Sequence, residues 1–163
     1  MIIGSLSENI NYEKRVAITP DIIKKYKSLG LDIILCENYA THLGIQDKEY
    51  QNEGVSIKKE DEIISSSNVI LQMNIPADKN LQKMKENQIL IGVLNPYSNE
   101  KKLKEITSKK INCFSLELLH RITRAQSMDI LSSQANLAGY KAVIDSFSYF
   151  QKAIPMMMTA AGT

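Results

Sequence analysis

The feature that most constrains this chain is the regular alternation of short apolar runs with longer stretches of helical spacing. Apolar runs stand at residues 2–6, 32–37, 55–57, 69–73, 89–94 and 111–116. They are continuously apolar and do not alternate with polar residues, which is typical of strands buried on both faces. Crossovers between parallel strands are right-handed. The pattern therefore predicts an α/β fold with a parallel sheet covered by helices on both sides.

Helix signals fill the segments between these runs. Thr19 and Pro20 stand at the N-cap and first helical position of a predicted helix that ends at Gly30. Further helices are predicted at 47–53, 60–66, 81–87 and 100–109. A chain of 163 residues with 44% apolar content has room for one such core. We predict a flavodoxin- or Rossmann-like doubly wound domain over residues 1–125.

Beyond residue 125 the pattern becomes that of one long helix, predicted at 128–150. One stripe of it carries large apolar residues, with small residues beside them: Leu137, Tyr140, Ile144 and Phe147, then Ala135, Ala138, Gly139 and Ala142. The small residues predict close packing against other elements. Pro155 breaks the pattern, and the apolar run 156–163 has no polar tail. We expect residues 126–163 to form a long helix and a hinge, in a chain cut from a longer one.

Composition argues against several other classes of protein. The formal charge is +2 and the lysine-rich stretches stand beside acidic residues, which favours solvated helix faces over a nucleic-acid patch. The apolar runs are far shorter than the roughly 20 residues that span a bilayer. Cys36 and Cys113 lie in strand-like runs and no leader precedes them, so we expect buried free thiols in a cytoplasmic protein. His42, expected in a loop, and His120 have no partners at metal-ligand spacing.

A polar segment follows the last predicted strand, where ligands collect in open α/β sheets. Gln126, Asp129 and Ser132 are spaced by three, so they share one face of a helix start, and Ser127 is a candidate cap. The spacing alone equally fits polar residues that only satisfy the helix's first amides. The glycines include no G-x-G pair and no P-loop, so the segment lacks the usual pyrophosphate cradle.

Two stretches carry a family resemblance that covers essentially the whole chain. The opening reads N-Y-E-K-R-V-A-I-T-P at 11–20, and the later segment reads R-I-T-R-A-Q-S-M-D-I-L-S-S-Q-A-N-L-A-G-Y-K-A-V-I-D at 121–145, with P-M-M-M-T-A-A-G-T at 155–163. The opening resembles one shared by proton-translocating NAD(P) transhydrogenases and alanine dehydrogenases. The later segment resembles the NAD(H)-binding component (alpha subunit, N-terminal part) of the transhydrogenases. A G-x-G-x-x-G turn is expected soon after residue 163.

The resemblance implies hydride transfer between NAD(H) and NADP(H) coupled to proton translocation. NAD(H) would be held mainly by a following Rossmann domain, NADP(H) by a partner component. Residues 121–132 would close over the nicotinamide, with Arg121 and Ser132 on its carboxamide and Ile122 and Thr123 in the same cofactor-binding loop. Gln126 and Asp129 would take the catalytic role of aligning the two rings, because direct transfer demands close approach of the carbons. The implied protein is a homodimer docked on a membrane-embedded partner at the cytoplasmic face of the membrane; the fragment alone is expected to be inactive.

Departures from the family pattern define the rival functions. His120 stands where relatives have Pro, and Gln72 stands where both families have Lys. The segment 92–99 contains no His, so the keto-acid machinery of an alanine dehydrogenase is reduced to Arg15, which we expect to pair with Glu13 or Glu37. An alanine dehydrogenase-type substrate domain is the first alternative. A non-enzymatic flavodoxin-like module is the second, although the strand ends lack the acidic cluster of a receiver.

Overall fold

The computed structural model describes residues 1–120 and 122–152, which fall into two compact units. The first unit is Met1–Leu119, and the second begins at His120. In the described residues no helix combines the length and apolar character needed to cross a membrane. Arg121 and the segment 153–163, on which several expectations fall, lie outside the described residues.

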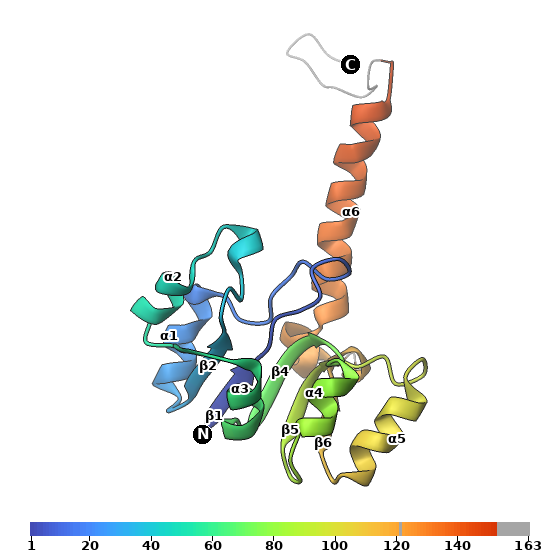
Figure 1. Ribbon diagram of the computed structural model, residues 1–163. Helices are drawn as coiled ribbons and strands as arrows, with labels where there is room; N and C mark the ends of the chain where they lie inside the picture. The colour runs from blue at the N-terminus through green and yellow to red at the C-terminus, as the bar shows by residue number, and fades with distance from the viewer. Residues whose placement is uncertain (121, 153–163) are drawn as a thin grey trace. The chain divides into compact units, whose positions relative to one another are not determined.

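The first unit is built on one six-stranded sheet in which every pair of neighbours is parallel (Figure 1). Its strands, in chain order, are β1 (Ile2–Ser5), β2 (Asp32–Cys36), β3 (Ser56–Lys58), β4 (Val69–Asn74), β5 (Ile89–Val93) and β6 (Asn112–Ser115). The spatial order is β3-β2-β1-β4-β5-β6. This is the Rossmann order, so the predicted doubly wound sheet is confirmed, with its topological switch point between β1 and β4.

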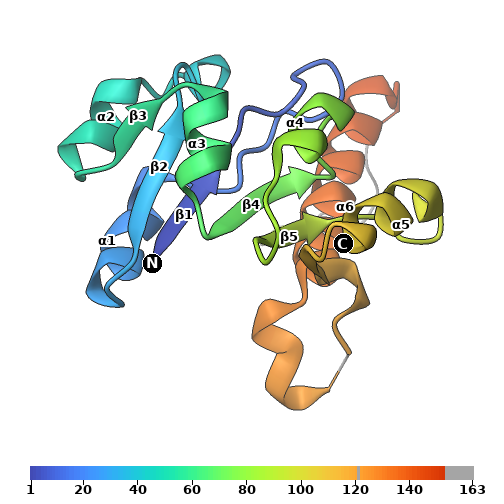
Figure 2. The ribbon, with the colours of Figure 1, turned by 60° about the horizontal axis from the view of Figure 1, so that its bottom comes forward.

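Helices cover both faces of this sheet (Figure 2). They are α1 (Pro20–Ser28), α2 (Asp47–Asn52), α3 (Glu60–Ser66), α4 (Asp78–Lys83) and α5 (Glu100–Ser108). Residues of α3, α4 and α5 share one buried cluster with Ile70 and Leu90, whereas α1 and α2 pack with Ile33 and Leu35 in the other. Complete burial of one such side chain stabilises the fold by about 1.5–3 kcal/mol.

The predicted bounds of most helices and strands lie within two residues of the observed ones, but the bounds of one helix were wrong. We predicted a helix at 81–87, but α4 spans Asp78–Lys83. The helix ends early because the backbone of Met84 is extended, and Asn87 further on adopts a left-handed φ of 66°. The helical spacing of the apolar residues at 81–87 reveals neither conformation. Thr19 holds the N-cap position of α1 as predicted, although its side chain caps nothing. His42 lies in a short 3₁₀ helix (Thr41–Leu43) and not in an irregular loop.

The second unit contains a 3₁₀ helix (Thr123–Met128) and the long helix α6 (Ile130–Tyr149). The cap of α6 is Asp129, whose carboxylate accepts the amides of Leu131 and Ser132; the expectation of Ser127 as cap was wrong. Asp has the better geometry here because it directly precedes the first helical residue. None of the residues of α6 is buried in the described structure, and the close packing expected of its small residues stays a prediction.

Candidate functional site

A cavity opens at the switch point of the sheet, at the carboxyl ends of β1 and β4. Its volume is about 630 Å³, within the usual range of small-molecule pockets. Its lining comes from the loop after β1, from the start of α3, from the end of β4 and from the start of α4, and includes Glu8, Glu13, Glu60, Gln72, Asn74, Lys79 and Asn80. Parallel sheets bind ligands at this position, because the chain leaves the two strands in opposite directions and opens a crevice.

Gln72 ties the two central strands together beneath this cavity. Its side chain is 4% exposed, and its Oε1 accepts the backbone amide of Leu6 at 2.8 Å and lies 3.2 Å from Ser5 Oγ. Leu6 is itself 1% exposed, so water cannot reach its backbone amide to accept a hydrogen bond from it. A neutral acceptor at this position therefore satisfies a buried donor at the point where β1 ends.

A hydroxyl network extends from Ser5 to the loop that carries the acidic residues. Ser5 donates to the carbonyl of Leu71 at 2.6 Å, which leaves Tyr39 to donate to Ser5 across 2.8 Å. The Tyr39 oxygen also accepts the amides of Ala17 at 3.1 Å and Ile18 at 3.3 Å. Burial raises the pKa of Tyr39 to about 12, which keeps the phenol protonated as this role requires. These hydrogen bonds hold Ala17 and Ile18, at the end of the loop that follows β1.

Arg15 pairs with Glu13, one of the two partners that the sequence suggested. Its Nε donates to Glu13 Oε1 at 2.8 Å and its second nitrogen to Oε2 at 2.7 Å, a bidentate geometry. These bonds lower the pKa of Glu13 to about 2 despite its burial. The Glu13 carboxylate occupies two of the guanidinium's donors, which a keto-acid carboxylate would otherwise claim.

Glu8 is the other carboxylate of this loop, and its partners are neutral. Its Oε1 accepts the backbone amide of Met73 at 2.7 Å and that of Asn74 at 3.3 Å, both at the end of β4. Desolvation is the largest influence on it and raises its pKa, with a further contribution from the charge of Glu13. Glu8 therefore holds the loop against β4 and carries negative charge into the cavity.

Comparison with known proteins decides the family. A family model described as "Alanine dehydrogenase/PNT, N-terminal domain" matches residues 4–138. The chain belongs to this family. It is 39% identical to the first of the alpha-subunit parts of the NAD(P) transhydrogenase of Rickettsia prowazekii, over all of the chain and 44% of that protein. It is 40% identical to the protein of the same name of Rhodospirillum rubrum, over 93% of the chain and 41% of that protein.

Solved structures of the family give the same order of similarity. The transhydrogenase from Sinorhizobium meliloti aligns with a TM-score of 0.89 and 38% identity over 99% of this chain and 48% of that one. An L-alanine dehydrogenase aligns with a TM-score of 0.67 and 18% identity over 72% of this chain and 32% of that one, which supports a shared fold. The chain thus spans less than half the length of these relatives.

The loop singled out from the sequence lies in the second unit of this family member. Ile122, Thr123 and Gln126 are exposed, while Arg121 is outside the described residues. Asp129 and Ser132 lie together at the start of α6, where the Ser132 hydroxyl donates to Asp129 Oδ2 at 2.7 Å. The capping interpretation is therefore correct for Asp129, which accepts two of the first amides, whereas the Ser132 hydroxyl bonds the capping carboxylate instead of an amide. The Ser132 oxygen can still accept a hydrogen bond, because the hydroxyl only donates to Asp129, and the side chain of Gln126 takes no part in the cap.

Several polar residues that line the cavity or support it from beneath could not be identified from the sequence. Ser5 carried no signal, because a single hydroxyl in an apolar run resembles any core residue, and Tyr39 stands in a turn segment without a recognisable motif. Glu8 belongs to no motif either, because it is a single acidic residue after the first strand. The cysteines were largely as expected: Cys36 is buried, but Cys113 is only partly so because it lies on the edge strand β6. Among the described residues, no group of His, Cys, Asp and Glu is arranged to hold a metal ion.

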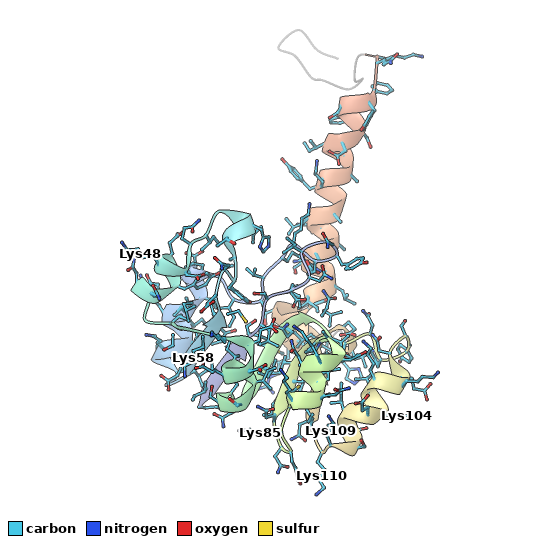
Figure 3. All side chains as sticks on the ribbon, in the orientation of Figure 1. Lys48, Lys58, Lys85, Lys104, Lys109 and Lys110 are labelled. Carbon is cyan, nitrogen blue, oxygen red and sulfur yellow. The ribbon has the colours of Figure 1, made fainter. Side chains whose placement is uncertain are left out.

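Several of the lysines form ion pairs or helix-end contacts at the surface, as expected of solvated faces. Lys85, Lys109 and Lys110 lie in the turns that lead into β5 and β6, at the opposite end of the strands from the cavity (Figure 3). Lys85 donates to the carbonyl of Ser65 and Lys109 to that of Gln82, at the last turns of α3 and α4. Lys110 pairs with Glu86 at 2.7 Å.

Proposed function

We propose that this chain is the amino-terminal part of the NAD(H)-binding component of a proton-translocating NAD(P) transhydrogenase. The similarity to transhydrogenases over nearly the whole chain carries the proposal: 38% identity at a TM-score of 0.89, against 18% and 0.67 for alanine dehydrogenase. The engagement of Arg15 by Glu13 and the neutral Gln72 also disfavour a keto-acid substrate. Hydride transfer to NADP(H), proton coupling, a homodimer and a membrane-embedded partner at the cytoplasmic face are all part of this proposal.

The loop of the second unit has the side chains that a nicotinamide carboxamide requires. A carboxamide presents one acceptor and two N–H donors, and the exposed amide of Gln126 offers both complements. Ser132 donates its proton to Asp129, so its oxygen remains an acceptor for the carboxamide nitrogen. Arg121 would supply a donor for the carboxamide oxygen. NAD(H), when bound, supplies the hydride, and these residues need only orient the ring.

Positioning is the role we assign to Gln126 and Asp129. The cap fixes Asp129 and Ser132 as a rigid pair at the first turn of α6, so both have a defined orientation. A misplacement of about 1 Å between reacting groups costs on the order of a hundredfold in rate. A neutral hydrogen bond contributes only about 0.5–1.5 kcal/mol to binding. Loss of orientation should therefore affect transfer more than affinity. We assign the pyrophosphate to the following domain, because these 163 residues contain no G-x-G turn.

The test replaces Gln126 by Asn in the complete component, assembled with its NADP(H)-binding partner. We expect hydride transfer to slow roughly 10- to 100-fold while NADH affinity stays within about threefold, because the shorter amide displaces the ring without removing the hydrogen-bonding group. Gln51→Asn is the matched control, since Gln51 is an exposed residue of α2. Equal losses of affinity and rate, or no loss at all, would contradict the positioning role.

A further inference from the structure

We propose that one face of α6 is the surface through which two copies of this chain form a dimer. The proposed function includes a homodimer, on which this inference rests and to which it adds a defined contact surface. The inference is tested by the mass of the assembly in solution. Its failure would therefore leave the hydride-transfer test of Gln126→Asn unaffected, and the two proposals can fail separately.

Large apolar side chains form a stripe along α6, which is one continuous helix (Figure 1). The stripe consists of four residues at spacings of three, four and three, with a fifth beside them: Leu137, Tyr140, Ile144 and Phe147, then Val143. All five are between 43% and 70% exposed. At 3.6 residues per turn they fall within an arc of about 120°. Apolar residues at these spacings form the seam between two paired helices.

The charges of α6 do not select a charged partner. The helix has two charged residues among its twenty, Lys141 and Asp145, and they form an ion pair with each other. Small residues such as Ala138 and Ala142 lie on the face opposite the stripe, so they add no charge either. The stripe is therefore an apolar surface without net charge. A second copy of α6 offers a surface of the same character.

The order of the side chains makes the stripe complementary to itself in an antiparallel pair. Two helices that cross at the level of Ala142 place Leu137 opposite Phe147 of the partner subunit. They place Tyr140 opposite Ile144 of the partner subunit in the same way. Each contact then joins an aliphatic side chain to an aromatic ring, so large and smaller groups interdigitate. A two-fold dimer requires such self-complementarity, because the same patch serves both subunits.

The area of the stripe is sufficient for a weak dimer. An aromatic side chain has about 150–250 Å² of surface to bury, and Tyr140, Phe147 and Phe150 are 70%, 49% and 51% exposed. These three rings together offer roughly 350 Å². The aliphatic residues of the stripe add on the order of 150 Å². Specific interfaces bury about 600–1,000 Å² per partner, so the stripe with its polar borders reaches the low end of that range.

Sedimentation equilibrium of the full chain measures the association, and we expect a reversible monomer–dimer equilibrium between about 1 and 500 μM. Tyr140→Glu and Ile144→Lys should each weaken the dimer at least about tenfold, because each places two charges in the apolar contact. Ala142→Glu is the matched control: it adds a charge at the same level of the helix on the opposite face. Its dissociation constant should stay within about threefold of the parent, and circular dichroism should show the same helix content in every variant.

A mixture of the two weakened variants tests the antiparallel arrangement. In a mixed pair the carboxylate introduced at position 140 faces the ammonium introduced at position 144, and the second contact of Tyr140 with Ile144 stays intact. The mixture should therefore associate at least about tenfold more tightly than either variant alone. A mixture no stronger than its components, or an Ala142→Glu variant as weak as Ile144→Lys, would overturn the proposal. A chain that stays monomeric up to about 500 μM would overturn it too, because another surface would then cover the stripe.

Discussion

Replacement of Gln72 by Met tests whether the neutral acceptor beneath the cavity holds the two central strands together. Met keeps the length and burial of the side chain but removes the oxygen that accepts the Leu6 amide at 2.8 Å. Leu6 is 1% exposed, so its N–H would remain unpaired inside the protein. Ser5 would lose less, because its hydroxyl still reaches the carbonyl of Leu71 at 2.6 Å and Tyr39 at 2.8 Å.

The expected cost follows from this single orphaned donor. An unpaired buried N–H destabilises by about 1–3 kcal/mol, and the burial of a thioether in place of an amide recovers a part of it. For a unit of 119 residues each kcal/mol lowers the melting temperature by about 3–6 °C. Urea unfolding of Gln72→Met should therefore show a lower midpoint with an unchanged slope.

Hydrogen exchange gives the residue-specific measurement. The Leu6 amide should exchange faster in Gln72→Met than in the parent, beyond what the change in global stability explains. Gln51→Met on the exposed face of α2 is the control and should stay within about 0.5 kcal/mol of the parent. If Gln72→Met were equally stable and left Leu6 protected, the amide would have another acceptor and the reasoning would fail.

Three further outcomes follow from the structure. Gly92→Ala should lower the free energy of unfolding in urea by about 1–3 kcal/mol, because its Cβ would lie 2.5 Å from a backbone carbonyl oxygen of β4. Gly139→Ala, whose Cβ meets open space, should instead stabilise α6 by up to about 1 kcal/mol, measured by thermal circular dichroism. The hydrogen bonds from Arg15 lower the pKa of Glu13 from 4.5 to about 2, so the stability that this pair adds to the fold is complete above pH 4.5 and is lost as the pH falls toward 2. In an acid titration of the free energy of unfolding, Glu13→Gln should therefore lose less stability over that range than the parent. Asp129→Ala should cost α6 about 1 kcal/mol and speed exchange of its first amides, an effect that Asp129→Asn should largely avoid.

The fold was predictable because its signals are local. Continuous apolar runs marked all six strands of the sheet, and the helix from Pro20 stopped near Gly30, where φ is +73°. The error at α4 has the same origin: a local pattern at 81–87 matched helical spacing, but the left-handed Asn87 was not visible in it. Local signals also misplaced the cap of α6, since Ser127 and Asp129 are both good capping residues and only the backbone decides between them.

The cavity was far less predictable, because the bonds that build it join residues distant in sequence. Gln72 contacts Leu6 across 66 positions, and Glu8 reaches Met73 across 65. Neither spacing has a sequence signature, whereas the Glu13–Arg15 pair, two residues apart, was foreseen as one of two options.

The network also gives a physical meaning to the departure at position 72. An ammonium there would present donors to the Leu6 amide, which is itself a donor, so the acceptor of Gln72 and the loop geometry of this chain depend on one another. Because Gln72 is neutral, the charges that line the cavity come from Glu8, Glu13, Glu60 and Lys79. The residue at which the sequence led us to expect a lysine is, in three dimensions, the acceptor that binds the backbone amide at the end of β1.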